Sequence, residues 1–516
     1  MKKSKFIFIG ILLSSILFHG CDGLNMTPAG SVSEDEFWQR DSDAEAAVMA
    51  VYSQLDDPTM VRQLDGVTDI AYRATSGPGT LHDVAGGNIV ASNDAITSIW
   101  DRYYRGVRRA NDVIAKIGTT EFGDPDKLNR IEAEARFLRA YYYTQLASLW
   151  GGVPLITEPI PITEEVGRTD RNVIVDFVID ELDDVISSGD LPPSAVGRAT
   201  MGAAHALKAR VALRHDRWAI ARDASKAVMD MGIYELYPDY EGLHEYEGEN
   251  SSEVIFDRQY ASDGDTYNAF AYSAASIGGS SIVEPVNKFY EYFEFNGPGP
   301  DVTGDPYENI DPRWNYTVYY TGQPIGNSTY DSRPSSNTGD AVNTSEFSTQ
   351  HGYNLKKGVD YENDNENSGN GSINMILIRY ADVLLMYAEA KIELNEIDNT
   401  VYDAINKVRE RPTVNMPPLT VASHGTQDEL REALRRERVV ELGFEGLRLF
   451  DMNRWELGAE KEGEVFGAHF YNNEGEEYLQ SIGFSRSFEE TDYLWPIPTS
   501  EMNSNSSITE NNPGYN

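Results

Sequence analysis

The chain has one cysteine, Cys21, among its 516 residues. A single cysteine excludes intrachain disulfides, cysteine-rich zinc sites and iron–sulfur clusters. Histidine is also scarce: the copies beyond the first 20 residues are scattered and lack the spacing of a zinc site. The sequence therefore predicts no cofactor and no metal centre.

Basic residues are few, with 43 Lys+Arg against 83 Asp+Glu and a formal net charge of −40. A nucleic-acid-binding protein needs a basic footprint that releases counterions from phosphates, so we expect no nucleic-acid partner. The hydrophobic fraction of 40 % and the charged fraction of 24 % are typical of a folded chain with a buried core.

Long apolar runs are missing beyond residue 21, and the only one before it, at 6–18, is too short to span a bilayer. Because lysines precede this run, it is typical of a signal peptide. The sequence Leu-Phe-His-Gly-Cys that ends at Cys21 looks like a lipobox, in which cleavage exposes a cysteine for lipidation. We therefore expect a lipoprotein signal peptide over 1–20 and a tether over 21–32. The alternative is a plain secretory signal with an incidental cysteine.

Helical periodicity dominates the two ends of the remaining chain. Its clearest stripe runs through 131–150, where apolar residues recur at spacings of three and four: Ile131, Ala135, Leu138, Tyr142, Leu146 and Leu149. Ser33 and Glu36 have the spacing of a capping box. Further helices are predicted over 44–55, 94–117, 171–187, 199–214, 217–231, 375–395, 400–411 and 427–444. They come in pairs with short connections, and 203–231 resembles a tetratricopeptide unit.

Two segments lack this period. Residues 59–98, rich in Gly, Asp, Asn and Ser, are predicted to form a long loop. Residues 236–373 are rich in Gly, Asn, Ser, Asp and Tyr, with short strand-like runs at 253–256 and 316–320. A loop-rich segment of this length on a helical scaffold is where function usually concentrates.

Templates for catalysis and metal binding fail. The sequence has no GxSxG, no HExxH and no phosphate-binding GxxxxGK[ST] motif. A segment starting at Asp364 resembles a calcium loop, with Gly369 at position six, but Met375 stands where a bidentate Glu is required. A solvated acidic turn explains it better. With so many acids, spacing alone cannot identify a catalytic carboxylate pair, so a glycosidase remains an alternative.

Aromatic residues in the loops carry the clearest binding signal. A sugar ring presents apolar C–H faces and hydroxyls, which suits a flat aromatic platform with polar neighbours. The candidates, for each of which core packing is the competing explanation, are Tyr72, Arg73, Trp100, Tyr267, Tyr272, Trp314 and Tyr316. Trp100 lies four residues before Tyr104 on a predicted helix, which favours core packing, whereas Tyr72 and Trp314 lie in irregular segments.

Several long motifs together resemble the SusD/RagB family of outer-membrane nutrient-binding lipoproteins. They are Ile131-Glu-Ala-Glu-Ala-Arg-Phe-Leu-Arg-Ala-Tyr-Tyr-Tyr with the following Leu149-Trp-Gly-Gly-Val-Pro, Leu377-Ile-Arg-Tyr-Ala-Asp-Val-Leu-Leu-Met-Tyr-Ala-Glu-Ala, Arg436-Glu-Arg-Val-Val-Glu-Leu-Gly-Phe-Glu-Gly-Leu-Arg-Leu-Phe-Asp-Met-Asn-Arg-Trp and Trp495-Pro-Ile-Pro. They occur in family order and span essentially all of 21–516.

This resemblance implies a mainly α fold: tetratricopeptide-like helix pairs in a right-handed helical scaffold with a loop-rich ligand-binding face. We expect one domain over 33–516, with its scaffold mainly in 33–235 and 374–460 and a loop-rich insert at 236–373. The resemblance also implies a surface-exposed lipoprotein of the outer membrane. Such a protein covers a SusC-like TonB-dependent transporter, to which it delivers captured oligosaccharides, and it is no enzyme.

The motifs themselves indicate scaffold rather than ligand specificity. Their charged residues are expected to pair between packed helices, where a planar guanidinium meets a carboxylate: Arg379, Asp382, Glu389, Arg436, Glu441 and Arg448. Phe444, Leu449 and Trp455 are expected to fill the core between those helices.

Three functions remain in competition. The first is a non-catalytic glycan-binding lipoprotein, the second a binder of peptides or another nutrient, and the third a glycoside hydrolase. The acidic composition favours neutral glycans over polyanionic ones, although it is explained equally well as an adaptation for solubility.

Overall fold

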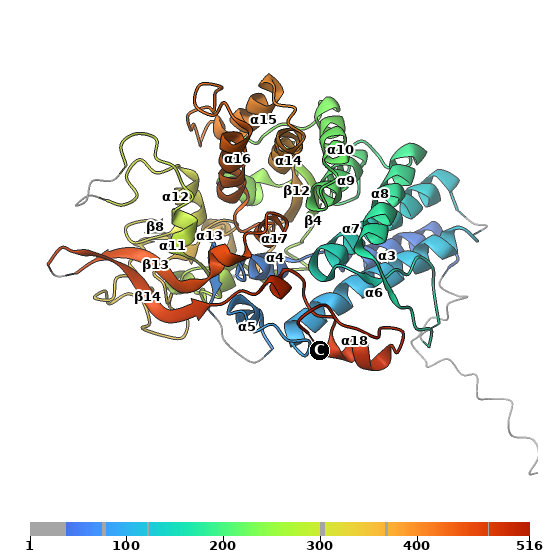
Figure 1. The fold of residues 1–516 in the computed structure, drawn as a ribbon, viewed down its shortest axis with the longest axis horizontal. Coiled ribbons are helices and arrows are strands. Elements are labelled where there is room, and N and C mark those ends of the chain that lie inside the picture. Colours follow the sequence, from blue (N-terminus) through green and yellow to red (C-terminus); the bar gives the residue numbers. More distant parts are fainter. Residues whose placement is uncertain are drawn as a thin grey trace, which may run out of the picture.

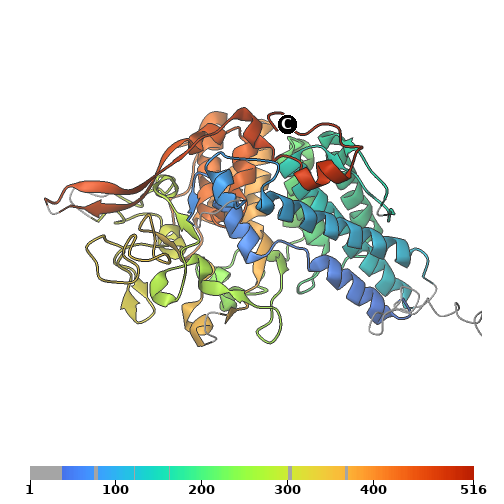
Figure 2. The same ribbon diagram turned by 90° about the horizontal axis from the view of Figure 1, so that it is seen from below.

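The computed structural model describes residues 38–74, 79–120, 123–161, 163–299, 305–366, 370–472 and 474–515. Cys21, the expected signal peptide and tether, and the Ser33–Glu36 capping box lie outside these ranges. Helices occupy the right and the top of the molecule in Figure 1, and a loop-rich region occupies the left. The view from below in Figure 2 shows the same division. The expected mainly α fold is confirmed.

The first group of helices comprises α3 (Asp41–Tyr52), α6 (Asp94–Ile117), α7 (Pro125–Trp150) and α8 (Arg171–Ser188). The side chain of Asn93 accepts hydrogen bonds from the first amides of α6. α7 starts after the capping Asp124 and ends at Gly151, whose φ of 72° favours glycine. α6 packs closely on α7 because Gly106 has no side chain: a Cβ there would lie 2.4 Å from the Tyr142 ring.

The second group continues the helix pairs: α9 (Met201–Arg214), α10 (Trp218–Asp230), α14 (Tyr380–Glu393), α15 (Asn399–Arg409), α16 (Gln427–Leu442) and α17 (Arg448–Arg454). α10 packs on both α9 and α14, and α14 packs on α15 and α16. Segments far apart in the sequence thereby share one hydrophobic cluster, whose buried residues run from Ala44 to Tyr515.

Three predicted elements were only partly correct. The predicted helix over 375–395 begins with strand β12 (Met375–Arg379), which pairs antiparallel with β4 (Val254–Arg258). Its apolar run Met-Ile-Leu-Ile suits a buried strand as well as a helix, and periodicity cannot separate the two. The expected loop over 59–98 contains α4 (Pro58–Asp65), β1 (Ala71–Arg73) and α5 (Leu81–Ala85). The strand-like run at 316–320 is divided between the end of α12 (Arg313–Thr317) and strand β7 (Val318–Tyr319).

The loop-rich region is built from short elements and two-stranded sheets. Its further strands are β5 (Tyr267–Asn268), β6 (Val283–Pro285), β8 (Pro324–Ile325), β9 (Ser328–Thr329), β10 (Asn354–Leu355) and β11 (Asn370–Gly371), with helices α11 (Asn287–Tyr290) and α13 (Tyr361–Glu366). The calcium-like segment forms part of α13, where Asp364 accepts a hydrogen bond from the Tyr246 hydroxyl (2.7 Å). Gly369 lies outside the described residues.

The longest hairpin was not predicted. Strands β13 (Gly463–Tyr471) and β14 (Glu477–Arg486) pair antiparallel with two register shifts, and they project at the left of Figure 1. The shifts break the strict alternation of apolar and polar residues that identifies a strand in the sequence.

Most of the predicted charged pairs form between buried segments. Glu441 accepts from Arg379 (2.6 Å) and from Arg411 (2.8 Å), and Arg448 pairs with Asp69 (2.7 Å). Asp382 pairs with Arg210 and Arg438, and Glu389 pairs with Arg454. Arg436 is the exception, since it is exposed and lies 3.2 Å from Glu294. Phe444, Leu449 and Trp455 are buried as expected.

A C-terminal segment closes the scaffold. The Trp150 indole donates to the Pro496 carbonyl (2.9 Å), and the Trp495 amide donates to the Leu149 carbonyl (2.8 Å). The Asn512 amide nitrogen donates to the Trp150 carbonyl (2.9 Å) and to the Trp495 carbonyl (2.7 Å). After α18 (Thr499–Ser504) this segment completes the core at the end of α7.

Within the residues that the structure describes, no helix combines the length and the apolar character needed to cross a membrane.

Candidate ligand-binding face

Strand β1 positions the first candidate residues. Tyr72 pairs with Glu284 of β6, and its ring lies 4.6 Å from His351, 4.9 Å from Phe484 and 5.7 Å from His82, measured between centroids. All three contacts are edge-on, the arrangement that aromatic quadrupoles favour. Tyr72 is only 3 % exposed, so it supports the rings around it rather than presenting a free face. Burial, with the nearby Glu284 carboxylate, raises the pKa of Tyr72 to about 12.

A buried carboxylate holds the neighbouring loop in place. Glu284 accepts hydrogen bonds from the Thr349 hydroxyl (2.7 Å), the Gln350 amide (3.0 Å) and the His351 amide (2.9 Å). Arg486, at the end of β14, donates to the Ala71 carbonyl (2.5 Å) from the other side. Segments near residues 72, 284, 350 and 486 are thereby fixed relative to one another.

Four side chains reach the surface around this cluster. His82 and Phe484 are half-buried, and their rings lie 5.0 Å apart. Gln350 is also half-buried, and its amide donates to the Ala74 carbonyl (3.3 Å). Phe347 is 51 % exposed, and its carbonyl accepts from the Ser281 hydroxyl (3.0 Å). We name His82, Phe347, Gln350 and Phe484 the ring face.

The ring face combines the groups that a sugar requires. Its aromatic rings offer apolar surface for C–H stacking, while the Gln350 amide and the His82 imidazole offer donors and acceptors for hydroxyls. His82 Nδ1 bonds the Arg73 carbonyl (2.8 Å), which orients the imidazole ring. No aspartate, glutamate, lysine or arginine side chain belongs to the ring face, so its chemistry suits a neutral ligand.

Arg73 ends the same strand, and Tyr272 lies close to it. Both are buried, and burial lowers the pKa of Arg73 below its ordinary value, opposed by the nearby Tyr272. The Tyr272 ring stacks under the Arg62 guanidinium at 5.3 Å, and its hydroxyl accepts from Gln63 (3.4 Å). The structure thus brings Tyr72, Arg73 and Tyr272 together, as supports of the strand rather than as exposed groups.

Trp314 is placed in the core. It is 0 % exposed, and its ring contacts Tyr290 (5.5 Å), Tyr307 (5.8 Å) and Tyr353 (5.1 Å). Because helix α12 turns the indole inward, the ring offers no face to a ligand in this structure. The competing explanation of core packing holds for this residue. Half-buried side chains such as Tyr320 and Ile282 pack at the edge of this cluster.

Tyr267 and Tyr316 are half-buried at separate places. Tyr267 lies edge-on to Tyr260 at 5.1 Å and donates to the Ile373 carbonyl (3.3 Å). Tyr316 packs near Tyr240, with centroids 6.3 Å apart. Burial raises the pKa of both Tyr267 and Tyr316 above the ordinary tyrosine value. Neither residue contacts the ring face.

Trp100 faces the opposite, helical side. It is 2 % exposed and packs against Tyr104 (4.7 Å) and Trp150 (5.2 Å), as expected for a core residue of α6. Its edge borders a cavity of about 400 Å³ that Tyr104, Pro154 and Asn111 also line. The Tyr104 hydroxyl donates to the Pro154 carbonyl (2.9 Å).

None of the four ring-face residues was among the sequence candidates. Phe484 lies on the unpredicted hairpin, and Phe347 and Gln350 lie in a loop without any periodic signal. The sequence identified only their neighbours on β1, Tyr72 and Arg73, which support the ring face from beneath.

Comparisons with known proteins agree with the fold. Residues 252–515 match the family model described as the SusD family, and residues 42–213 match a model described as starch-binding associating with outer membrane. SusD-like protein P2 of Formosa agariphila is 28 % identical over 536 residues, which cover 100 % of both chains. A SusD-like protein of Bacteroides ovatus is 24 % identical and covers 98 % of this chain and 97 % of its own.

Solved structures give the same result. The crystal structure of a SusD-like carbohydrate binding protein from Bacteroides fragilis superposes with a TM-score of 0.83 at 28 % identity, covering 92 % of this chain and 99 % of that one. A second SusD-like protein from Bacteroides fragilis gives a TM-score of 0.80 at 26 % identity and covers 95 % of this chain and 100 % of its own. The first family model alone covers half of the sequence, and the helical scaffold matches throughout. The chain therefore belongs to the SusD family.

Proposed function

We propose that this chain is a non-catalytic glycan-binding lipoprotein of polysaccharide utilisation, held on the surface of the outer membrane by a lipid on Cys21. The observation that carries the proposal is the ring face, where His82, Phe347, Gln350 and Phe484 join apolar rings to uncharged polar groups. Support also comes from the Bacteroides fragilis structure, whose protein is described as carbohydrate binding, and from the family model described as associating with the outer membrane.

Capture at such a face would be non-covalent and modest in affinity. A sugar ring stacked on one aromatic side chain gains about 0.5–1.5 kcal/mol beyond the area it buries. Several stacked units and hydrogen bonds would reach about −8 kcal/mol, which corresponds to micromolar binding. Delivery to a SusC-like TonB-dependent transporter completes the proposed role, because a surface lipoprotein without a channel needs a partner to move its ligand inward.

Calorimetry with a panel of neutral oligosaccharides tests the glycan part. Phe484→Ala is expected to weaken binding by roughly two- to tenfold, the loss of one stacking partner. Phe466→Ala, an exposed ring on the same hairpin but outside the ring face, serves as the matched control and is expected to bind normally. Equal binding by both variants would contradict the location of the site.

Chromatography of the glycans after incubation separates binding from hydrolysis, since a binding protein leaves the chains intact. If no glycan binds and peptides do, the nutrient class is wrong while the family role stands. Co-purification of the lipidated protein with a TonB-dependent barrel from outer membranes tests the transporter partner.

A further inference from the structure

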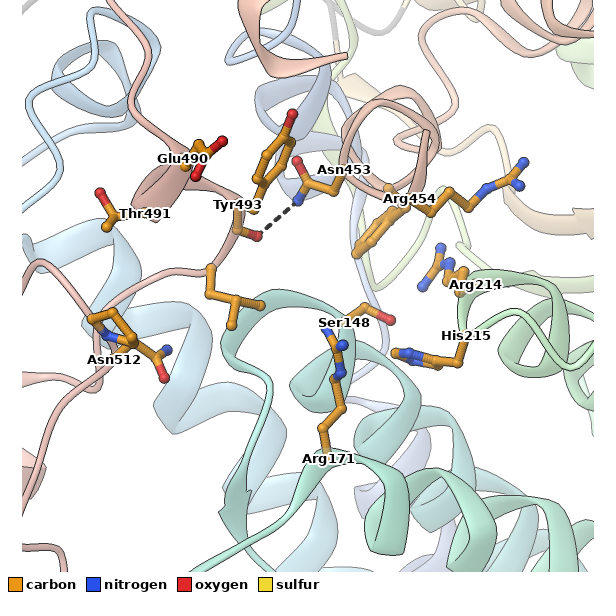
Figure 3. A pocket seen from close by; sticks show the side chains of 13 residues that line it. Ser148, Arg171, Arg214, His215, Asn453, Arg454, Glu490, Thr491, Tyr493 and Asn512 are labelled. Carbon is orange, nitrogen blue, oxygen red and sulfur yellow. Dashed lines mark hydrogen bonds between the residues drawn. The ribbon is translucent and has the colours of Figure 1, made fainter. Parts of the chain in front are cut away.

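A second pocket lies among the helices, away from the ring face. It has a volume of about 400 Å³, within the range of small-molecule sites, and is formed by α7, α8, α9, α17 and the C-terminal segment. Figure 3 shows Arg171, Arg214 and His215 pointing into the same space from α8 and from the end of α9. Ser148 and Asn453 add polar groups from α7 and α17.

The arginines of this pocket are not equally neutralised. The Arg454 guanidinium is fully compensated, since it pairs with Glu389 and with Asp451 (2.8 Å). Among the described residues, the Arg214 guanidinium hydrogen-bonds only an uncharged side chain, donating to the Gln145 oxygen (2.7 Å). Burial, with Arg210 nearby, lowers the pKa of Arg214 to about 9, so the side chain remains charged at neutral pH.

Arg171 carries the second available positive charge. It is the first residue of α8 and is exposed at the rim of the pocket. Across the described ranges of the chain it takes part in no ion pair within 4.0 Å. Its five N–H donors are therefore available to a ligand, in the planar fork that matches a carboxylate.

His215 lies among these positive charges, and its imidazole has a free ring nitrogen in the pocket. Its Nε2 atom is buried and has no hydrogen-bond partner among the described residues. Burial first, and then the charges of Arg171, Arg214 and Arg217, lower the pKa of His215 to about 3. A neutral imidazole at this position can donate one hydrogen bond to an anion without adding charge.

Two acidic side chains lie at the edge of the pocket. Glu490 is the carboxylate among the residues that line the pocket, and its side chain is exposed. Asp216, next to His215, is exposed as well. Because both acids are exposed, solvent and salt screen their charges more strongly than they screen the charge of the buried Arg214. Two buried acids, Asp451 and Asp382, also lie close enough to Arg214 to oppose the lowering of its pKa, but each is already paired with other arginines.

Part of the remaining lining is apolar. Phe450 lies under Arg214, with the guanidinium carbon 3.6 Å from the ring centroid, and Leu494 and Pro513 add apolar surface beside the polar Thr491, Tyr493 and Asn512. A small inorganic ion would leave these walls without contacts. An organic body with one acidic group would use both parts of the pocket.

We propose that this pocket binds a small organic carboxylic acid of the size of a uronic acid sugar. The carboxylate pairs with the Arg171 guanidinium and accepts from Arg214 and His215, while the C–H surface of the ring packs on Phe450 and Leu494. The site is separate from the ring face and does not depend on its function.

Calorimetry with D-glucuronate and D-glucose at pH 7 and about 0.15 M salt tests the site, since the two sugars differ only in the carboxylate. Glucuronate is expected to bind at least roughly tenfold more tightly than glucose, and Arg171→Met to abolish most of that difference. Arg136→Met removes a half-buried arginine of α7, which lies away from the pocket and pairs with Glu132 (3.2 Å), and is expected to bind like the wild type. Because Arg171 is exposed, the Met variant is expected to melt at the wild-type temperature.

A second measurement follows His215 directly. Saturating glucuronate is expected to raise the pKa of His215 in an NMR titration, because a bound anion offsets the charges of the arginines; His215→Gln assigns the signal. Equal binding of glucuronate and glucose, or an Arg171→Met variant that binds normally, would overturn the proposal. Binding of inorganic phosphate without glucuronate would overturn the assignment to a carboxylate.

Discussion

Glu441 offers the sharpest test of how the scaffold is held together. Its carboxylate is completely buried and accepts hydrogen bonds from three arginines: Arg379 (2.6 Å), Arg411 (2.8 Å) and Arg313 (2.9 Å). Arg379 comes from β12, Arg411 from the segment just after α15, and Arg313 from α12 of the loop-rich region. One side chain therefore joins the helical scaffold to the loop-rich region.

Glu441→Gln keeps the shape and removes the charge. Each arginine retains another carboxylate, such as Glu253 for Arg379 and Arg411, so the cluster does not lose all of its partners. It does lose the one carboxylate that all three arginines share, and the new amide NH₂ faces their N–H donors. Breaking a buried ion pair in this way costs about 3–5 kcal/mol. We expect the free energy of unfolding to fall by that amount at pH 7.

Equilibrium unfolding in urea, followed by far-UV circular dichroism, measures this loss. Glu432→Gln is the matched control: it lies on the same helix, its side chain is 73 % exposed, and it stands 3.7 Å from Arg435. A surface pair of this kind contributes about 0–1 kcal/mol. If Glu441→Gln unfolds within about 1 kcal/mol of the control, the cluster does not stabilise the scaffold as argued.

The same variant has a distinct pH dependence. Burial alone would raise the pKa of Glu441, but Arg411, Arg379 and Arg313 outweigh it and hold the pKa well below the ordinary value. A carboxylate whose pKa is lower in the folded state than in the unfolded state stabilises the fold at pH values above its unfolded-state pKa, here about 4.3. This stabilisation is lost as pH falls. The gap between wild type and Glu441→Gln is therefore expected to narrow below about pH 4.

Two further changes probe other parts of the fold. Asp65 is buried with one bond, from the Gly446 amide (2.8 Å), and burial raises its pKa to about 7. A raised folded-state pKa means that Asp65 contributes its full stability below the unfolded-state pKa of about 3.9 and loses it as pH rises to about 7. In urea unfolding, the free energy of unfolding of Asp65→Asn relative to that of the wild type should therefore increase by about 4 kcal/mol between pH 4 and 8. Gly106→Ala places a Cβ 2.4 Å from the Tyr142 ring and should lower the free energy of unfolding by about 1–3 kcal/mol. The control Gly118→Ala, whose new Cβ has its nearest contact at 3.6 Å, should be neutral or stabilising. Equal melting temperatures of the two variants would refute the steric argument.

The helices could be predicted because their signal is local. The stripe from Ile131 to Leu149 is visible within one helix, and α7 extends it by a few residues to the Asp124 cap. The charged pairs of Arg379 and Glu441 could be expected from the motifs, although their partners Arg411 and Glu253 could not. Partner choice depends on which helices pack together, and no local pattern records that.

The ring face could not be assembled from the sequence for the same reason. Tyr72, Gln350 and Phe484 lie on three distant segments that meet only through β1, β6 and the end of β14. Trp314 shows the converse: a tryptophan in an irregular segment is as suitable for a core as for a ligand platform. The inward orientation of its indole is set by α12, a one-turn helix that is too short to show a periodic sequence pattern.

The C-terminal segment has a consequence for the order in which this protein can fold. The bonds from Trp150 to Pro496 and from Asn512 to Trp150 join residues 346 and 362 positions apart. Contacts of such high sequence separation form late, since the loop-closure entropy is lost before they contribute. While the protein is being synthesised, the end of α7 therefore stays open, with the Trp150 indole and carbonyl bound to water, until the last residues arrive. The N-terminal helices are thus held in an incomplete, chaperone-accessible state for most of the time that synthesis takes.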